Sequence, residues 1–237
     1  MSSWDKLRKN IISEFRTAPG NFLHMPTIKK CLHPGPSRYN KTVGDDYYKK
    51  LKRRSDLPKE DPTLGTPFYI KEGRSLVTLQ SAYYIRLMKD RFSLEDIDVI
   101  YDVGGGYGNM CRIIKEMGYK GYYVLIDFPE LHEIQRYYLG NLGLNVSMNV
   151  AYKKLEDRAI RPKGNSLLIA THSMNEMPLV DRPKVNIDRF SKFFIAYNKE
   201  FDGIDNIEYF KQFKDLPHKT EYFQNEIQDQ HHFLIGY

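Results

Sequence analysis

The residues best suited to chemistry lie in a glycine-rich stretch that follows a hydrophobic segment. Residues 99–103 are mostly apolar, and the acid and glycines of interest are Asp102, Gly104, Gly105, Gly106 and Gly108. Glycine has no Cβ, so the backbone can turn tightly there and approach a bound ligand closely. A helix that begins after such a turn presents unpaired N–H groups and its positive dipole end to that ligand. The stretch therefore predicts a ligand-binding loop, with a turn that serves packing alone as the alternative.

The glycine spacing distinguishes two classes of ligand. A dinucleotide loop spaces its glycines as G-x-G-x-x-G to seat a pyrophosphate, and here the third glycine comes one position early. The carboxylate of Asp102 is unfavourable beside a pyrophosphate but suits the ammonium group of a methionine moiety. Asp127, nineteen residues after Gly108, ends the next expected strand and can accept hydrogen bonds from both ribose hydroxyls. The pattern favours S-adenosylmethionine over NAD.

Three segments resemble a known family. Asp-Val-Gly-Gly-Gly-Tyr-Gly at 102–108 and Leu-Ile-Asp-Phe-Pro-Glu at 125–130 are similar to the D-V-G-G-G-x-G and D-L-P pattern of small-molecule O-methyltransferases with a Rossmann-like fold. With Ser-Met-Asn-Glu-Met at 173–177, the chain most resembles the sugar O-methyltransferases of bacteria. The resemblance covers about residues 74–237. It implies S-adenosylmethionine as cofactor, Phe128 against the adenine, and a sugar hydroxyl as methyl acceptor.

The candidate general base follows the fourth expected strand. Methyl transfer to oxygen is an in-line displacement, so the enzyme must align a hydroxyl and remove its proton. His172 titrates near neutral pH and is the candidate base. In plant-type O-methyltransferases an H-x-x-x-D/E segment carries the catalytic histidine, and His172 with Glu176 matches it, although the D-W-S-D part does not. Glu176 is expected to orient His172, to bind a hydroxyl of the acceptor or to be the base itself. The structural alternatives are that His172 only hydrogen-bonds a backbone group at the end of the strand, and that Glu176 is an acid that interacts with the dipole at the start of a helix.

Other polar residues have two interpretations each. Asn175 is predicted to hydrogen-bond the substrate or to cap a helix. Tyr107 is predicted to contact the substrate or to pack in the protein interior. The acid pair at 156–157 reaches the adenine amine or is a solvated turn, and the histidines at 231–232 are interpreted as surface or packing residues. Asp181 and Asp188 form no convincing metal-binding set, so no metal ion is expected.

Hydrophobic periodicity predicts the elements that position these residues. Strands are expected over residues 99–103, 122–127, 146–150, 166–171 and 193–197, followed by a hairpin over 220–223 and 232–236. Helices are expected over 109–117, 129–141, 178–190 and 206–216. The pattern predicts the α/β class: a doubly wound, seven-stranded, mostly parallel sheet with the last strand antiparallel, as in Rossmann-like methyltransferases.

Residues 1–95 are predicted to form an N-terminal helical cap that contributes to the acceptor site, and residues 96–237 the catalytic domain. In the cap, helices are expected over residues 4–15, 45–54 and 76–92, the last capped by Ser75, with loops over 26–37 and 55–67.

Charge is unevenly distributed along the chain. The 36 Lys and Arg residues exceed the 30 Asp and Glu residues, but residues 1–95 carry 19 basic and 10 acidic residues and residues 96–237 carry 17 and 20. The basic group Lys49, Lys50, Lys52, Arg53 and Arg54 favours a phosphate-bearing acceptor such as a nucleotide-linked sugar, with a solvated surface as the alternative.

Two other functions are weighed against a sugar O-methyltransferase. An RNA methyltransferase is disfavoured because no D/N/S-P-P-Y/F/W motif follows the fourth expected strand and no RNA-binding module is recognisable. A non-catalytic cofactor-binding protein of the same fold is disfavoured because neither the glycine loop nor Asp127 is degraded.

Hydropathy and cysteine content indicate the cellular compartment in which the protein is expected. The longest aliphatic run covers only residues 167–170, far below a membrane span, and the start has no apolar signal segment. Two cysteines cannot form a disulfide framework. A cytoplasmic protein without a membrane span is expected.

Overall fold

The computed structural model describes residues 3–51, 56–144, 148–155 and 160–237. These residues belong to two compact units, each described here by itself. The first unit comprises Met1–Leu87, Gly106–Tyr119 and Phe128–Met148, and the second comprises Met88–Gly105, Lys120–Asp127 and Asn149–Tyr237. The chain passes from the second unit to the first within the glycine-rich stretch, after Gly105.

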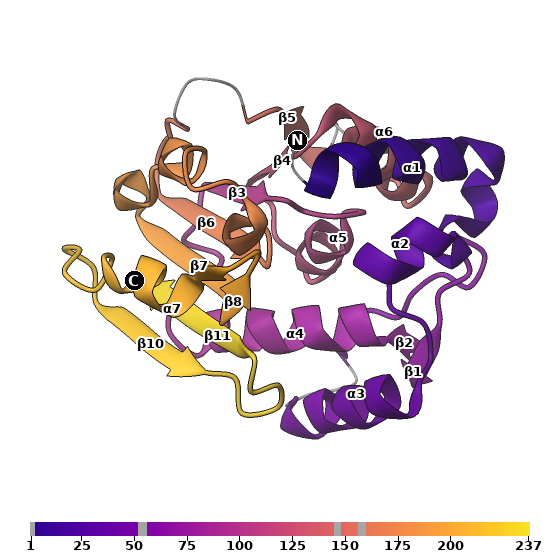
Figure 1. The fold of residues 1–237 in the computed structure, drawn as a ribbon, viewed down its shortest axis with the longest axis horizontal. Coiled ribbons are helices and arrows are strands. Elements are labelled where there is room, and N and C mark those ends of the chain that lie inside the picture. Colours follow the sequence, from indigo (N-terminus) through magenta and orange to yellow (C-terminus); the bar gives the residue numbers. More distant parts are fainter. Residues whose placement is uncertain (1–2, 52–55, 145–147, 156–159) are drawn as a thin grey trace. The chain divides into compact units, whose positions relative to one another are not determined.

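A seven-stranded sheet forms the second unit (Figure 1). Its strands are β3 (Val99–Val103), β4 (Tyr122–Ile126), β5 (Val150–Lys153), β6 (Ser166–Thr171), β7 (Lys192–Asn198), β10 (Thr220–Gln224) and β11 (His231–Gly236), in the order β10-β11-β7-β6-β3-β4-β5. Strands β3 to β7 are parallel, and β11 is antiparallel to both of its neighbours. The predicted sheet, with its reversed last strand, is confirmed.

The central strands of this sheet are almost wholly apolar, as expected for buried parallel strands. Leu168 and Ala170 of β6, with Phe193 and Ile195 of β7, are fully buried in one hydrophobic cluster. β5 begins at Val150, later than predicted, and residues 146–147 of that prediction lie outside the described residues.

The predicted helix over residues 178–190 is wrong. Two 3₁₀ turns, Arg182–Val185 and Ile187–Arg189, replace it and are separated by Asn186 in the left-handed region, with φ +62°. Pro183 explains the change, because it lacks an N–H and disfavours helical backbone at the preceding residue. The helix predicted over residues 206–216 is present but shorter, as α7 (Asn206–Lys211).

The first unit is mainly helical (Figure 1). Its helices are α1 (Ser3–Thr17), α2 (Pro26–Cys31), α3 (Arg38–Lys50), α4 (Leu76–Lys89, whose last two residues belong to the second unit), α5 (Asn109–Glu116) and α6 (Pro129–Asn141), with a 3₁₀ helix at Pro19–His24 and a short hairpin of β1 (Tyr69–Lys71) and β2 (Arg74–Ser75). Helix α1 packs along α6, and its Arg16 makes two hydrogen bonds to Glu133. Helices α5 and α6 match their predicted ranges within one residue.

Helix caps explain where α3 and α4 begin. Ser75 Oγ accepts from the backbone N of Thr78 at 3.2 Å, which confirms the predicted cap of α4. Ser37 caps α3, accepting from Asn40 N at 3.0 Å, so this helix begins earlier than predicted and ends at Lys50. The predicted loop over residues 26–37 instead begins with α2, because Pro26 fits the first helical position. Residues 52–54 of the basic group lie outside the described residues.

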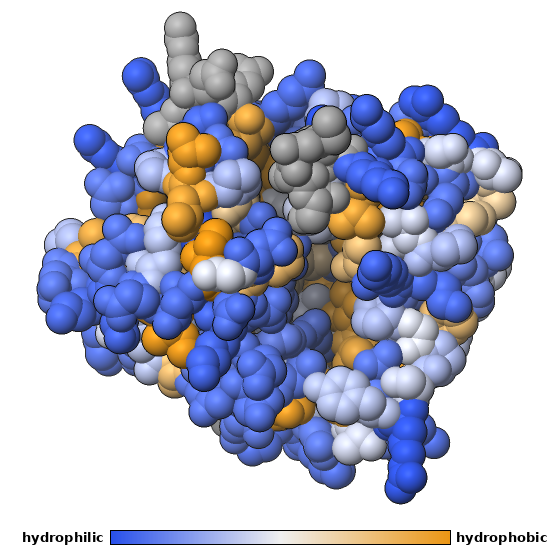
Figure 2. Space-filling view, viewed as in Figure 1, coloured by the Kyte–Doolittle hydropathy of each residue, from blue (hydrophilic) through white to orange (hydrophobic). Residues whose placement is uncertain are grey.

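Hydrophilic residues cover most of the face shown in Figure 2. In the described ranges of the chain, no helix has both the length and the apolar character that a membrane crossing requires.

Candidate functional site

Asp102 lies near the end of β3 and is completely buried. One carboxylate oxygen, Oδ2, accepts a hydrogen bond from Tyr123 Oη of β4 at 2.8 Å, whereas Oδ1 has no partner among the described residues. Burial raises the pKa of Asp102 to about 7, and the hydrogen bond from Tyr123 opposes this rise. A buried carboxylate with one unused oxygen suits a positively charged donor from a ligand.

Gly104 and Gly105 continue directly from β3. Gly104 has φ +73°, and a Cβ there would lie 2.2 Å from Ser173 Cβ. A Cβ on Gly105 would lie 2.5 Å from Leu125 Cδ2. Ser173 also donates from Oγ to the Val103 carbonyl, and Gly104 N donates to the Ile126 carbonyl at 2.8 Å. Close packing therefore requires glycine at both positions. The contact of Ser173 with the glycine-rich stretch was not predicted from the sequence.

The rest of the glycine-rich stretch belongs to the first unit. Gly106 and Gly108 have φ +59° and +98°, values that favour glycine. Gln135 of α6 donates from Nε2 to the Gly106 carbonyl at 2.9 Å, and Gly108 is the residue immediately before α5. The stretch thus ends at a helix N-terminus, as predicted.

Tyr107 is packed inside the first unit and is 2% exposed. Its ring contacts Phe22, His33 and Tyr138 at centroid distances of 5.9, 5.8 and 5.0 Å. His33 Nε2 accepts from the backbone N of Phe68 at 3.1 Å, so a neutral His33 carries its proton on Nδ1, which lies 3.4 Å from Tyr107 Oη. These contacts account for Tyr107 as a packing residue, and its contact with substrate stays a prediction.

Asp127 and Phe128 follow β4. Asp127 N donates to the Lys153 carbonyl at 3.1 Å, and its half-buried side chain lies beyond the carboxyl end of β4. Because β3 and β4 are parallel and adjacent, Asp127 and Asp102 lie toward the same edge of the sheet. Phe128, in the first unit, is 38% exposed, with Arg8 Cζ 5.1 Å from its ring centroid.

His172 follows β6 and has φ +61°, a strained backbone for a residue other than glycine. Its ring centroid lies 4.3 Å from that of His231. Burial, with a smaller effect of His231, lowers the pKa of His172 to about 3, and burial lowers that of His231 to about 4. Both imidazoles are therefore neutral at neutral pH. The expectation that His172 titrates near neutral pH is wrong, because burial lowers its pKa and makes it a weaker base than a free imidazole.

The contact of His231 with His172 was not predicted, because it depends on strand register. β11 runs antiparallel to β7, so His231 at its start pairs with Asn198 at the carboxyl end of β7. His172 after β6 therefore contacts His231 at the start of β11, which agrees with a packing role for His231.

Asn175 and Glu176 lie in a 3₁₀ turn, Met174–Glu176, after His172. Arg182 positions this turn from a buried site, donating to the carbonyls of Asn175 at 2.7 Å and Met177 at 3.0 Å and to Asn206 Oδ1 at 2.9 Å. The side chain of Asn175 is fully buried, and neither its oxygen nor its nitrogen has a partner among the described residues. Glu176 is half-buried and follows the strained backbone of His172 by one turn.

Two further predictions concern the acid pair and metal ions. The acid pair at 156–157 lies outside the described residues. Within the described parts of the chain, no three His, Cys, Asp or Glu side chains are grouped so that they could hold a metal ion.

Comparison with solved structures identifies the fold. No protein-family model and no curated protein sequence matches the chain. Two structures of the methyltransferase domain of bacterial CtHen1 superpose on about two thirds of this chain. The CtHen1-CN structure is 14% identical in sequence, covers 66% of this chain and 96% of its own, and has a TM-score of 0.51. The CtHen1-C structure is 9% identical, covers 66% of this chain and 95% of its own, and has a TM-score of 0.50. The chain has the Rossmann-like methyltransferase fold. A methyltransferase of Aquifex aeolicus, described as dependent on S-adenosylmethionine, is similar over 65% of this chain and 88% of its own, at 19% identity and TM-score 0.49.

Proposed function

We propose that the protein is an S-adenosylmethionine-dependent O-methyltransferase that acts on a hydroxyl of a sugar or sugar-containing small molecule. The observation that carries the proposal is Asp102, a buried carboxylate with an unused oxygen beside the glycine-rich stretch of a methyltransferase fold. A dinucleotide phosphate is disfavoured there, because a carboxylate repels it.

The chain's residues fit this cofactor. The Oδ1 atom of Asp102 is available for the ammonium group, and Asp127 is suited to the ribose hydroxyls. The aromatic ring of Phe128 is partly exposed, as a residue that contacts adenine must be. When bound, S-adenosylmethionine supplies a methyl group that its sulfonium sulfur already activates.

The acceptor is proposed to bind near the carboxyl ends of β6 and β7. His172, Asn198 and His231 lie there, and all are uncharged at neutral pH. Uncharged donors and acceptors suit a hydroxyl compound better than a carboxylate or an ammonium group. His172 would accept the proton of the acceptor hydroxyl during methyl transfer, with Glu176 as the alternative base.

Replacing His172 with alanine is expected to lower methyl transfer by about 100-fold or more and to leave the affinity for S-adenosylhomocysteine unchanged, because the base acts on the acceptor alone. His232→Ala is the matched control, since His232 directly follows His231 on β11 but stacks on Tyr197, with ring centroids 5.7 Å apart. Initial rates and calorimetry make the comparison. Normal turnover of the His172 variant would transfer the role of base to Glu176.

The acceptor class is tested with S-adenosylmethionine labelled in its methyl group. Free sugars, nucleotide-linked sugars and short RNAs are offered separately, and label is expected in a sugar fraction. Preference for nucleotide-linked sugars would support a phosphate-bearing acceptor. Label in RNA alone would contradict the proposal and favour the RNA methyltransferase alternative, and label in none despite cofactor binding would favour a non-catalytic protein.

A further inference from the structure

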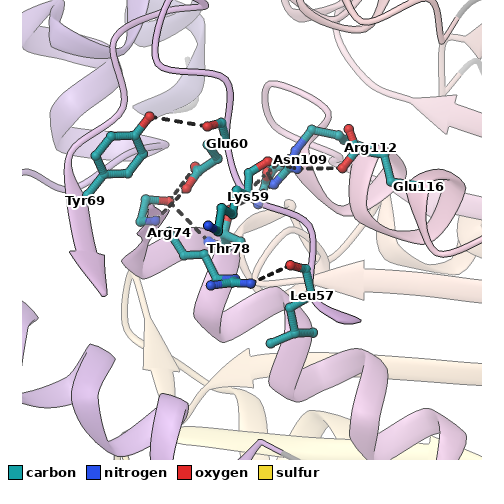
Figure 3. A network of polar contacts seen from close by, with 10 residues as sticks. Leu57, Lys59, Glu60, Tyr69, Arg74, Thr78, Asn109, Arg112 and Glu116 are labelled. Carbon is teal, nitrogen blue, oxygen red and sulfur yellow. Dashed lines mark hydrogen bonds and ion pairs between the residues drawn. The ribbon is translucent and has the colours of Figure 1, made fainter. Parts of the chain in front are cut away.

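Asn109 is the first residue of α5 and follows Gly108 directly. Its side chain is only 3% exposed, and its amide is held on one side by the polar network drawn in Figure 3. Oδ1 accepts from Arg112 Nε at 3.2 Å and Nη2 at 3.0 Å, and from Thr78 Oγ1 at 3.3 Å. The opposite atom of the amide, Nδ2, has no hydrogen-bond partner among the described residues.

Arg112 determines which way this amide faces. A guanidinium has only donors, so the oxygen of Asn109 must face it and the NH₂ group must face away. Arg112 is itself 1% exposed and is fixed by further contacts, from Nη1 to Glu116 Oε2 at 2.8 Å and to the Lys59 carbonyl at 3.1 Å, and from Nη2 to Thr78 Oγ1 at 3.1 Å. The amide therefore presents a fixed, unused donor.

The segment that supports Arg112 is itself well fixed (Figure 3). Glu60 is buried and accepts from Ser75 N at 2.5 Å and from Ser75 Oγ at 2.6 Å, next to the start of α4. Arg74 is buried as well and donates to the Leu57 carbonyl at 2.6 Å. Arg74 thus contacts the same segment as Arg112, but no contact of Arg74 with Asn109 is observed.

We propose that Asn109 Nδ2 binds the carboxylate of the methionine moiety of the cofactor, and that Arg112 is a positioning residue that orients Asn109 for this contact. The inference rests on the proposed function. Nδ2 is a donor, so it can bind the carboxylate but not the ammonium group. The first N–H groups of α5 lie beside it and favour an anion at the same place. A buried amide N–H without a partner is also unfavourable unless a ligand uses it.

Three probes test this assignment by calorimetry: S-adenosylhomocysteine, its decarboxylated analogue, which keeps the amine, and 5′-methylthioadenosine, which lacks both groups. Asn109→Ala is expected to weaken S-adenosylhomocysteine binding by about 10- to 100-fold, the range for a hydrogen bond to a charged group, and to leave the other two affinities unchanged. Arg112→Met should produce the same selective loss, because it releases the amide. Arg74→Met is the matched control and should not change the ratio of the three affinities.

The pattern across probes separates binding from folding. Thermal melts report the folded fraction of every variant, and Asn109→Asp provides a second variant, whose carboxylate should repel S-adenosylhomocysteine selectively. An equal loss for all three probes, or no loss for S-adenosylhomocysteine, would overturn the assignment of Asn109. If the unsubstituted protein binds none of the probes, the proposed function fails, and the inference fails with it.

Discussion

Asp102→Asn is expected to stabilise the ligand-free protein at about pH 8 and to weaken S-adenosylhomocysteine binding there by about 10-fold or more. Burial raises the pKa of Asp102 from 3.8 to about 7 in the folded protein. The folded protein therefore holds this proton more tightly than the unfolded chain does. The stability that the neutral carboxyl provides is complete below about pH 4 and is lost as the pH rises through about 7. Asparagine cannot ionise, so it removes a penalty of roughly 2–4 kcal/mol at about pH 8.

Binding should have the opposite dependence on pH. The ammonium of the ligand pairs with the ionised carboxylate, so the affinity of the unsubstituted protein is expected to rise between about pH 6 and 8. This rise should disappear in Asp102→Asn. Tyr123→Phe is an informative companion, because it removes the hydrogen bond that favours the ionised form and should move the midpoint to higher pH. Denaturant unfolding and calorimetry at several pH values test both effects, and a pH dependence that persists in Asp102→Asn would contradict this role.

Gly104→Ala is expected to destabilise the protein by roughly 2–5 kcal/mol and to abolish cofactor binding in the molecules that still fold. Two effects add: the left-handed backbone at φ +73°, and a Cβ placed 2.2 Å from Ser173 Cβ. Gly140→Ala is the control, because a Cβ there meets nothing within 4 Å and Gly140 lies within α6, where alanine is favoured.

Ser173 provides the internal test of the Gly104 prediction. Removing its side chain in Gly104→Ala/Ser173→Gly should recover part of the lost stability, because the overlapping atoms are gone. Thermal and urea unfolding measure the recovery. A Gly104 variant as stable as Gly140→Ala would show that the close packing at the loop is wrong.

The sheet, helix α5 after the glycine-rich stretch and helix α6 after Asp127 were predictable, because several short-range sequence signals indicate the same elements there. Apolar strands end in an acid or in glycine, Gly108 precedes α5, and Pro129 occupies the first turn of α6. The helix over residues 178–190 was predicted wrongly because the apolar residues there are spaced as in a helix. Pro183 and the left-handed backbone of Asn186 divide this segment into two 3₁₀ turns.

The site was only partly predictable, since its remaining contacts join distant segments. The pairing of His172 with His231 depends on the antiparallel register of β11. The contact of Arg112 with Lys59 spans 53 positions. Neither has a signature at short range, whereas Asp102 and the glycines carry their signal within a few residues.

Calorimetric titration with S-adenosylhomocysteine, and with NAD for comparison, tests whether the glycine-rich stretch and Asp127 bind S-adenosylmethionine. We expect one molecule of S-adenosylhomocysteine to bind per chain, weakened by about 10-fold or more in Asp127→Ala because the ribose hydroxyls lose a charged acceptor, and no binding of NAD. Binding of NAD in place of S-adenosylhomocysteine, no binding of either ligand, or an affinity unchanged by Asp127→Ala would show that these residues do not form a site for S-adenosylmethionine.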